Sequence, residues 1–320
     1  MNESPPPPAP PGSGPSPAPG ETIIRRDERV RGLLYIAGSA LGFAVMNVLL
    51  KLLLRDHGLP PGELVVARSL LGLLILYPLL KLRGIPLLYS NPVLLTLRGV
   101  FGGVAIVCFV FALQLTTLTK ASFLSYAYPI FATVITWLVL KEGVTRTGVA
   151  ALAVAIGGVA LMMRPGQLGT FRAGDWLALV SALFSGAAIT TLRRVRSAES
   201  TSVVVLHFAF WCTLIGLPAM FVTVADGALR FGASHLTLPG GAAGWACLLG
   251  VGGLGIGCQM LLTNAYRYVR TSEGSTMSLL NAVFGAVLGV LILGDRLEPM
   301  EWAGGAVTLA GCALLLLSKR

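Results

Sequence analysis

Long runs of hydrophobic residues, broken by short polar or Pro/Gly-rich segments, recur from Leu33 to Leu317. Each run holds about 17–23 residues, enough to cross a hydrocarbon core of about 30 Å at 1.5 Å per residue. The pattern predicts an all-α membrane protein with ten transmembrane helices. Their expected bounds are Leu33–Leu54, Glu63–Leu80, Gly99–Leu115, Ala121–Leu140, Thr147–Met163, Asp175–Leu192, Ser202–Val224, Gly244–Tyr266, Gly274–Leu293 and Met300–Leu317.

The composition supports this reading. Hydrophobic residues make up 55% of the chain and charged residues only 12%, with a mean hydropathy of +0.79. A soluble protein averages about 45–50% apolar and about 25% charged residues. The five cysteines all lie in expected spans without CxxC spacing, so we expect neither a disulfide framework nor a zinc site, and no cofactor.

The net charge of +10 would suggest a nucleic acid partner in a soluble protein. Here its distribution indicates topology instead. With a cytoplasmic amino terminus, the inner side collects 16 Lys and Arg residues and the outer side 7. This bias follows the positive-inside rule, and ten spans return the carboxyl terminus to the cytoplasm. We therefore expect a multi-pass inner-membrane protein with no nucleic acid partner.

Residues 1–31 are expected to form a cytoplasmic tail whose first part, rich in Pro, Ser, Gly and Ala, is disordered. No short apolar core with a small-residue cleavage site opens the chain, so the first run should be retained as a span.

An internal repeat appears when the chain is shifted by 153 residues, which lays Leu118–Leu161 over Thr271–Leu314 with about a quarter of positions identical. Ser125 then meets Ser278, and an acidic turn meets another acidic turn. An odd number of spans per copy forces the second copy to enter the membrane from the opposite side. The sequence thus predicts two inverted five-helix repeats, residues 32–165 and 174–318, with a substrate site near the midplane between them.

Ionisable residues within membrane spans are rare, which makes Arg68 and His207 candidates for substrate binding. An arginine fork suits a carboxylate or phosphate, although Arg68 could instead snorkel to the nearby surface. His207 could carry a proton, because Asp and Glu residues occur only at span ends or in loops. It could equally hydrogen-bond a neighbouring helix.

Neutral polar residues complete the candidate site. Asn47, Gln259 and Asn281 can orient a polar solute, or bridge two helices. Tyr126 and Tyr128 should point to different faces of one helix, so that at most one reaches a cavity unless Pro129 kinks the helix between them.

A GxGxxG pattern at residues 250–255 matches the dinucleotide-binding fingerprint only in letters. It lies inside an apolar helix, without the preceding strand that the fingerprint requires. We interpret these glycines as small residues at a close helix crossing.

The span Ala121–Leu140 carries Ser-Tyr-Ala-Tyr-Pro at residues 125–129, followed by Lys141-Glu142 and a Gly-Gly-rich helix that ends in Arg164-Pro165. This order resembles the EamA-type drug/metabolite transporter superfamily, over about Gly32 to Lys319. The resemblance implies two five-helix domains that move a small molecule. The first two helices, with Asn47 and Arg68, also resemble the subset that contains S-adenosylmethionine permeases. The second copy departs from the pattern, with Asn281-Ala282 in place of Tyr128-Pro129.

The leading hypothesis is a secondary transporter for a polar metabolite, such as an amino acid derivative or an S-adenosylmethionine-like solute, acting by alternating access. A membrane-embedded enzyme acting on a lipid or lipid-linked group is the alternative, but no nucleophile, metal cluster or carboxylate pair occurs at midplane. A channel would need a filter segment that the sequence lacks. The partners are then a small-molecule substrate and the lipid bilayer, with a homodimer left open.

Overall fold

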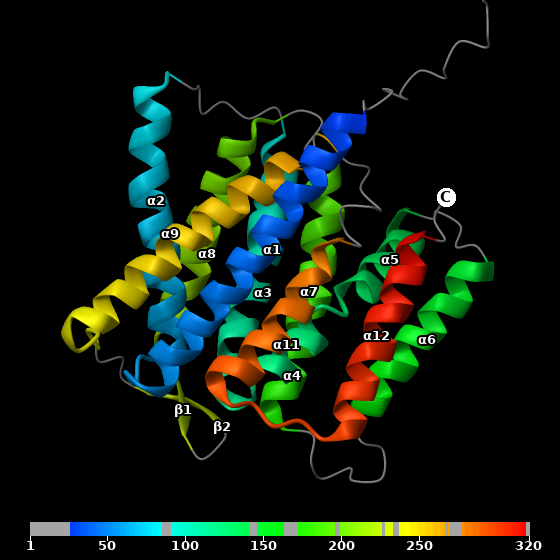
Figure 1. Ribbon diagram of the computed structural model, residues 1–320. Coiled ribbons are helices and arrows are strands. Elements are labelled where there is room, and N and C mark those ends of the chain that lie inside the picture. Colours follow the sequence, from blue (N-terminus) through cyan, green and yellow to red (C-terminus); the bar gives the residue numbers. More distant parts are fainter. Residues whose placement is uncertain are drawn as a thin grey trace, which may run out of the picture.

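The hydrophobic runs fold into helices over most of the chain (Figure 1). The computed structural model describes residues 26–84, 91–140, 146–162, 172–195, 199–225, 228–232, 237–265, 268 and 277–317. Its elements are α1 (Arg26–Arg55), α2 (Pro61–Leu82), α3 (Pro92–Leu115), α4 (Leu118–Ser125), α5 (Tyr128–Leu140), α6 (Arg146–Met162), α7 (Ala173–Val195), α8 (Thr201–Ala219), β1 (Val222–Ala225), β2 (Ala228–Phe231), α9 (Gly241–Ala265), α11 (Leu280–Leu293) and α12 (Pro299–Leu317). The all-α expectation is confirmed, with one antiparallel hairpin, β1–β2, added.

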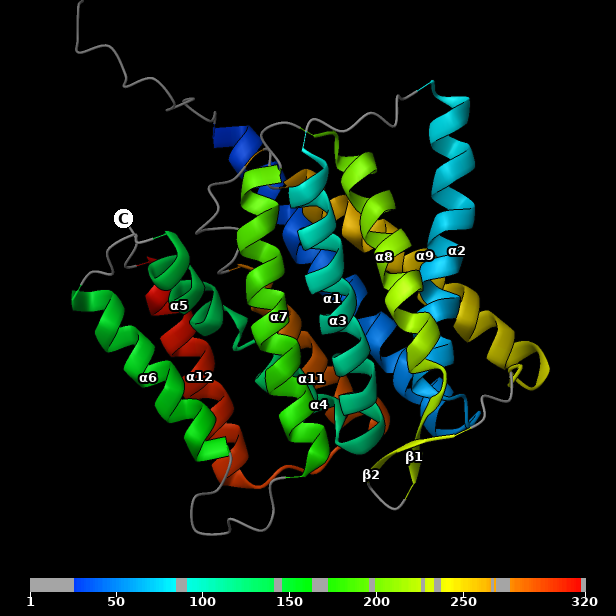
Figure 2. The same ribbon diagram turned by 180° about the vertical axis from the view of Figure 1, so that it is seen from behind.

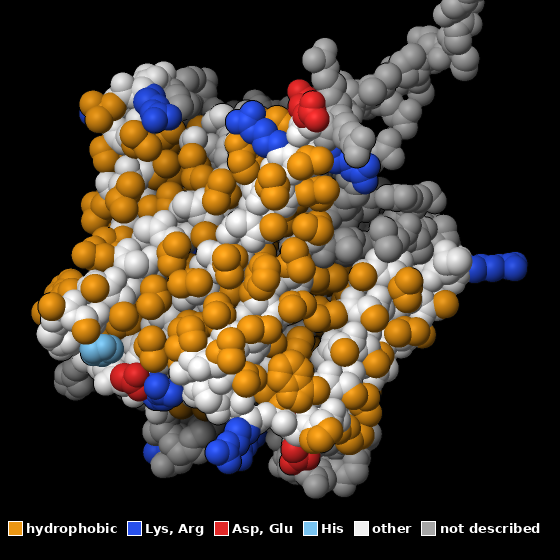
Figure 3. All heavy atoms as spheres, in the orientation of Figure 1, with side chains coloured by type: hydrophobic (Ala, Val, Ile, Leu, Met, Phe, Trp, Pro, Cys, Tyr) orange, Lys and Arg blue, Asp and Glu red, His pale blue; other side chains and the backbone are white. Residues whose placement is uncertain are grey.

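Six of the described helices, α1, α2, α3, α7, α8 and α9, contain stretches long and apolar enough to cross a membrane. Two shorter apolar helices lie at Arg146–Leu161 and Leu280–Leu293. Hydrophobic side chains cover the middle of the face seen in Figure 3, and most of its Lys, Arg, Asp and Glu side chains gather toward the upper and lower edges. This distribution fits a multi-pass protein embedded in a bilayer.

The helices pack as long antiparallel neighbours. α1 lies along α9 and α3 lies along α7, while α2 packs on α8 and α6 on α12. Figures 1 and 2 show that α1 and α7 run in opposite directions, as do α6 and α12. α1 begins and α12 ends at one end of the bundle, which we call the termini end. The hairpin lies at the opposite end, which we call the hairpin end.

The expected span Ala121–Leu140 is broken in two. Residues Tyr126 and Ala127 form a turn between α4 and α5, and the carbonyl of Ala127 accepts a hydrogen bond from the Ile130 N–H at 3.0 Å. Pro129 explains the break, because proline has no N–H and fits only the first turn of a new helix.

A second break occurs at the position that matches the first by the 153-residue shift. Leu279 interrupts the helix between Ser278 and α11, and its carbonyl accepts from the Ala282 N–H at 3.0 Å. No proline follows here. The expected span Gly274–Leu293 is therefore interrupted too, and its first residues lie outside the described ones.

The seventh expected span, Ser202–Val224, is too long. α8 ends at Ala219, directly after Pro218, and Val222 already belongs to β1. The hairpin lies in the connection between α8 and α9 (Figure 2).

The largest apolar cluster packs toward the hairpin end. It joins the end of α1, the start of α2, the end of α3 and α4 through fully buried side chains such as Leu50, Leu64, Leu113 and Leu124. α9 and α11 complete it. Tight packing therefore fills this end of the bundle.

Polar side chains also connect helices at the hairpin end. Lys120 lies 3.0 Å from a carboxylate oxygen of Asp175 on α7 and 3.5 Å from one of Glu301 on α12. Asp295 accepts hydrogen bonds from the backbone N–H and the hydroxyl of Thr119, both at 2.9 Å. These five residues, here called the polar cluster, connect the start of α4 to the later helices of the chain.

Candidate substrate cavity

A cavity of about 190 Å³ opens among α1, α3, α7 and α9, beside the two helix breaks. Six of the seven predicted site residues line it: Asn47, Arg68, Tyr126, Tyr128, Gln259 and Asn281. Space on this scale holds several water molecules or a small organic solute. Residues far apart in the sequence are thus brought to one place.

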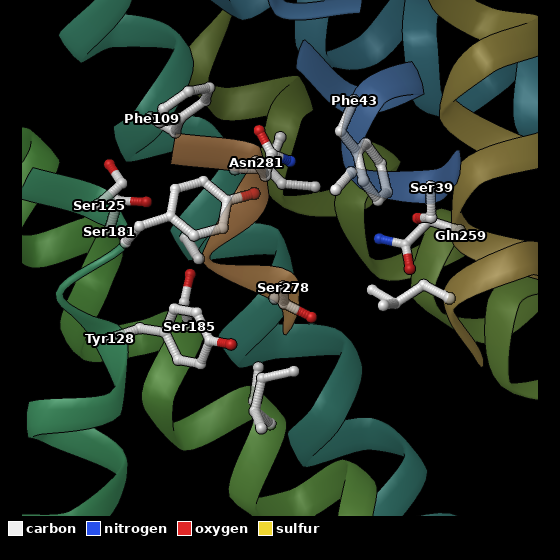
Figure 4. Close-up of a pocket in the computed structure, with 18 of the residues that line it drawn as sticks. Ser39, Phe43, Phe109, Ser125, Tyr128, Ser181, Ser185, Gln259, Ser278 and Asn281 are labelled. Carbon is white, nitrogen blue, oxygen red and sulfur yellow. The ribbon is translucent and has the colours of Figure 1, made fainter. Parts of the chain in front are cut away.

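Neutral hydrogen-bonding groups line the cavity together with apolar side chains such as Phe43 and Phe109. Figure 4 shows Tyr128 and Ser185 on one side, with Ser39 and Gln259 on the other. Some of these groups also serve helix packing. The Ser39 hydroxyl donates to the Cys258 carbonyl at 2.8 Å, and the Ser125 hydroxyl donates to the Ala178 carbonyl at 3.3 Å.

The break between α4 and α5 allows both tyrosines to reach the cavity. The rings of Tyr126 and Tyr128 meet edge to face, with centroids 6.1 Å apart. A continuous helix would turn residues two apart to different faces. The kink considered for Pro129 thus occurs, in the form of a complete helix break.

Asn281 takes the place of Tyr128 at the second break. Its side chain is only 2% exposed, and its Oδ1 has no hydrogen-bond partner in the part of the chain that the structure describes. A buried acceptor without a partner is costly, which makes it available to a solute that carries N–H or O–H groups.

Arg68 reaches the cavity from α2 and is 8% exposed. None of the described residues forms a hydrogen bond or an ion pair with its guanidinium. It also lines a smaller side pocket of about 30 Å³ between α2, α8 and α9, together with Ser69 and Gly255. The burial argues against snorkelling to the surface.

Arg98 is a lining residue that the sequence analysis missed. We expected it in the inner loop before a span that starts at Gly99, but α3 begins at Pro92, where the Asn91 side chain accepts from the Leu94 N–H at 3.1 Å. This places Arg98 inside the helix, 7% exposed, with its guanidinium carbon 4.5 Å from the centroid of the Phe208 ring. The charge of Arg98 therefore does not mark a helix boundary.

His207 is the one predicted site residue that is not among the lining residues. It is partly buried on α8, with its ring centroid 6.3 Å from that of Phe210. Its proton role stays a prediction. Arg68 and Arg98 are the only charged residues in the described lining of the cavity.

Comparisons with known proteins match the chain to a family of transporters. The sequence model of the EamA-like transporter family matches residues 30–164 and again residues 172–317. The chain is 26% identical over 289 residues to the pseudopaline exporter CntI of Pseudomonas aeruginosa, covering 90% of this chain and 97% of that protein. It is 28% identical over 292 residues to an uncharacterized transporter of Helicobacter pylori, covering 90% and 94%.

More distant similarities agree. Solute carrier family 35 member G1 of Mus musculus is 23% identical over 290 residues, covering 86% of this chain and 75% of that protein. A solved crystal structure of a protein 18% identical in sequence superposes with a TM-score of 0.59, covering 92% of this chain and 99% of the other. That last similarity shows a shared fold.

Proposed function

The chain belongs to the EamA-like transporter family, and on this premise we propose that it moves a small polar metabolite, such as an amino acid derivative or an S-adenosylmethionine-like solute, across the inner membrane by alternating access. The cavity is the substrate site in this proposal. Arg68 carries the argument: it is buried, and none of the residues that the structure describes forms a hydrogen bond or an ion pair with it, whereas a purely structural arginine at this depth would be paired.

The proposed topology is ten spans in two inverted five-helix halves, with both termini cytoplasmic. Under it, α1 corresponds to α7, α2 to α8, α3 to α9, α4–α5 to the segment that ends in α11, and α6 to α12. The helix contacts support this correspondence. Exchanging the halves turns the α1–α9 contact into the α3–α7 contact, and leaves the α2–α8 and α6–α12 contacts unchanged.

The described state is closed toward the hairpin end in this proposal. The apolar cluster and the polar cluster lie between the cavity and that end. With the termini end in the cytoplasm, the hairpin end faces outward. Opening the outer side then requires the ion pairs of Lys120 to separate, while the cavity closes toward the cytoplasm.

Counterflow into vesicles reconstituted with the purified protein tests the proposal. Vesicles loaded with one unlabelled metabolite at a time should accumulate the same labelled metabolite for at least one member of a panel of amino acid derivatives, organic acids and S-adenosylmethionine. A well-folded protein that gives no counterflow across the panel would contradict the proposed function.

A further inference from the structure

A side pocket adjoins the substrate cavity at Arg68. Four residues line both spaces, namely Arg68, Ile106, Phe208 and Gln259. Gln259 belongs to α9 and lies at one side of the cavity (Figure 4). The side pocket, between α2, α8 and α9, has a volume of about 30 Å³, against about 190 Å³ for the cavity. A solute with a group bound at Arg68 therefore has both spaces beside it.

The walls of the side pocket are mostly apolar. Side chains such as Val205, Ala209 and Ile256 form them, and Ser69 adds a hydroxyl group. A water molecule in a cavity needs two to four polar partners, which these walls provide only near Arg68 and Gln259. A single water occupies about 10–15 Å³ measured in this way, so the pocket has room for about two or three carbon atoms. It suits a short aliphatic group.

Two small residues set the depth of the side pocket. A β-carbon at Gly72 on α2 would lie 3.6 Å from the β-carbon of Ala209 on α8 and 3.6 Å from the Cγ1 of Ile256 on α9. These are ordinary van der Waals distances, so a methyl group would fit at residue 72 without displacing a neighbour. An unfilled apolar space destabilises a protein. The space beside Gly72 is thus one that a single methyl group could fill.

Arg68 supplies the charge where the two spaces meet. It is 8% exposed, and none of the described residues forms a hydrogen bond or an ion pair with its guanidinium. The planar fork of an arginine binds both oxygens of a carboxylate. In the main cavity, the buried Oδ1 of Asn281 has no hydrogen-bond partner among the described residues and can accept from an amino or hydroxyl group.

We propose that the side pocket is the specificity pocket of the substrate site, and that it takes a short aliphatic branch of a solute whose carboxylate group binds Arg68. This inference rests on the proposed function and narrows it to carboxylate solutes that are distinguished by the length of one branch. A branch of about two or three carbon atoms fills the pocket. A longer branch meets its wall.

The test uses a homologous series of 2-amino acids in thermal-shift titrations of the purified protein. The series is glycine, L-alanine, L-2-aminobutyrate, L-norvaline and L-norleucine, each compared with its own carboxamide. We expect the affinity to rise about fourfold with each carbon until the pocket is full, and to fall at L-norleucine. Each carboxamide should bind about tenfold or more weakly than its acid, because it lacks the charge that pairs with Arg68.

Variants of the two small residues assign the preference to the side pocket. Gly72→Ala should make the best binder about one carbon shorter, and Ala209→Gly should make it about one carbon longer. Gly257→Ala on α9 is the matched control, because a β-carbon there meets nothing within 4 Å and the change brings the same gain in helix propensity. It should leave the chain-length profile unchanged. Opposite shifts in preferred length are not produced by a general change in stability.

Four results would overturn the inference. They are an affinity independent of branch length, a profile that neither Gly72→Ala nor Ala209→Gly shifts, carboxamides that bind as tightly as their acids, and no binding of any member of the series. In the last case, counterflow of a different solute would leave the transporter proposal standing while the specificity pocket falls. Failure of both assays would reject both. Should one variant fail to fold, the other still tests the pocket.

Discussion

The guanidinium of Arg68 on α2 lies so close to Gly255 on α9 that a β-carbon at position 255 would stand 3.1 Å from its Nε. Gly255 belongs to the glycine-rich segment at residues 250–255, which lies within α9. The absence of a side chain there gives the arginine its place at the cavity. A close helix crossing, as the sequence suggested, thus also accommodates a charged group.

Gly255→Ala should therefore weaken solute binding without unfolding the protein. The added methyl group must displace the guanidinium by a few tenths of an ångström, and we expect about three- to tenfold lower affinity from the misplaced fork. Gly253→Ala is the matched control, because a β-carbon there meets nothing within 4 Å on the same helix. Equal affinities for the two variants in thermal-shift titrations would show that the Arg68 position is not critical.

Arg68→Gln should raise the stability of the ligand-free protein. Replacing a buried charge with which none of the described residues pairs removes a desolvation cost, and we expect about 1 kcal/mol, or an increase in Tm of roughly 2–4 °C. The same variant should lose solute binding, as residues retained for function often reduce stability. A fall in Tm, measured without solute in detergent, would identify Arg68 as a structural residue instead.

Lys120→Gln should open the hairpin end more often. The change leaves the carboxylate of Asp175, which is 1% exposed, without its cation. Loss of about 1.4 kcal/mol from the closed state would raise the open population about tenfold.

The readout for Lys120→Gln is the rate at which a membrane-impermeant thiol reagent added outside intact cells modifies Ser185→Cys in the cavity. We expect a smaller increase for Glu301→Gln, whose ion pair with Lys120 is longer at 3.5 Å. A rate unchanged by Lys120→Gln would argue against a gate at this place.

Asp295→Asn should destabilise the start of α4. The carboxylate accepts two hydrogen bonds from Thr119, and an amide oxygen is the weaker acceptor, so we expect a loss of about 1–2 kcal/mol. In a Thr119→Val background, which removes the hydroxyl donor, the loss should be smaller. Asp56→Asn, at an exposed ion pair with Arg55, serves as the control in the same thermal unfolding assay, where little change is expected.

Much of the site can be predicted from the sequence, because a polar side chain that faces lipid costs free energy. Asn47, Arg68 and Asn281 had to face the interior wherever their helices packed, and they line one cavity. Length and hydropathy located the helices for the same reason. The sequence does not predict which side chains meet in the cavity, because these contacts depend on how helices that are far apart in the sequence pack against each other.

The sequence reading failed where local chemistry overrides hydropathy. Arg98 interrupts a hydrophobic run in the sequence, yet a cation over the Phe208 ring is tolerated inside α3. The break at Leu279 carries no proline signal, and only its match with the break at Tyr126 indicates it. The hairpin after Pro218 lies in an apolar segment that hydropathy alone extends as a helix.

The central claim, that a solute crosses the membrane through this cavity, is tested most directly on α7. Ser185 lines the cavity, whereas Leu183 on the same helix is 40% exposed on the outer surface of the bundle. Each is changed to Cys in a protein whose five native cysteines have been replaced, and flux of the solute found by counterflow is measured after treatment with the impermeant thiol reagent. We predict that modification of Ser185→Cys abolishes flux, that the solute slows this modification, and that Leu183→Cys vesicles keep their flux. Full flux after complete modification of Ser185→Cys would contradict the account.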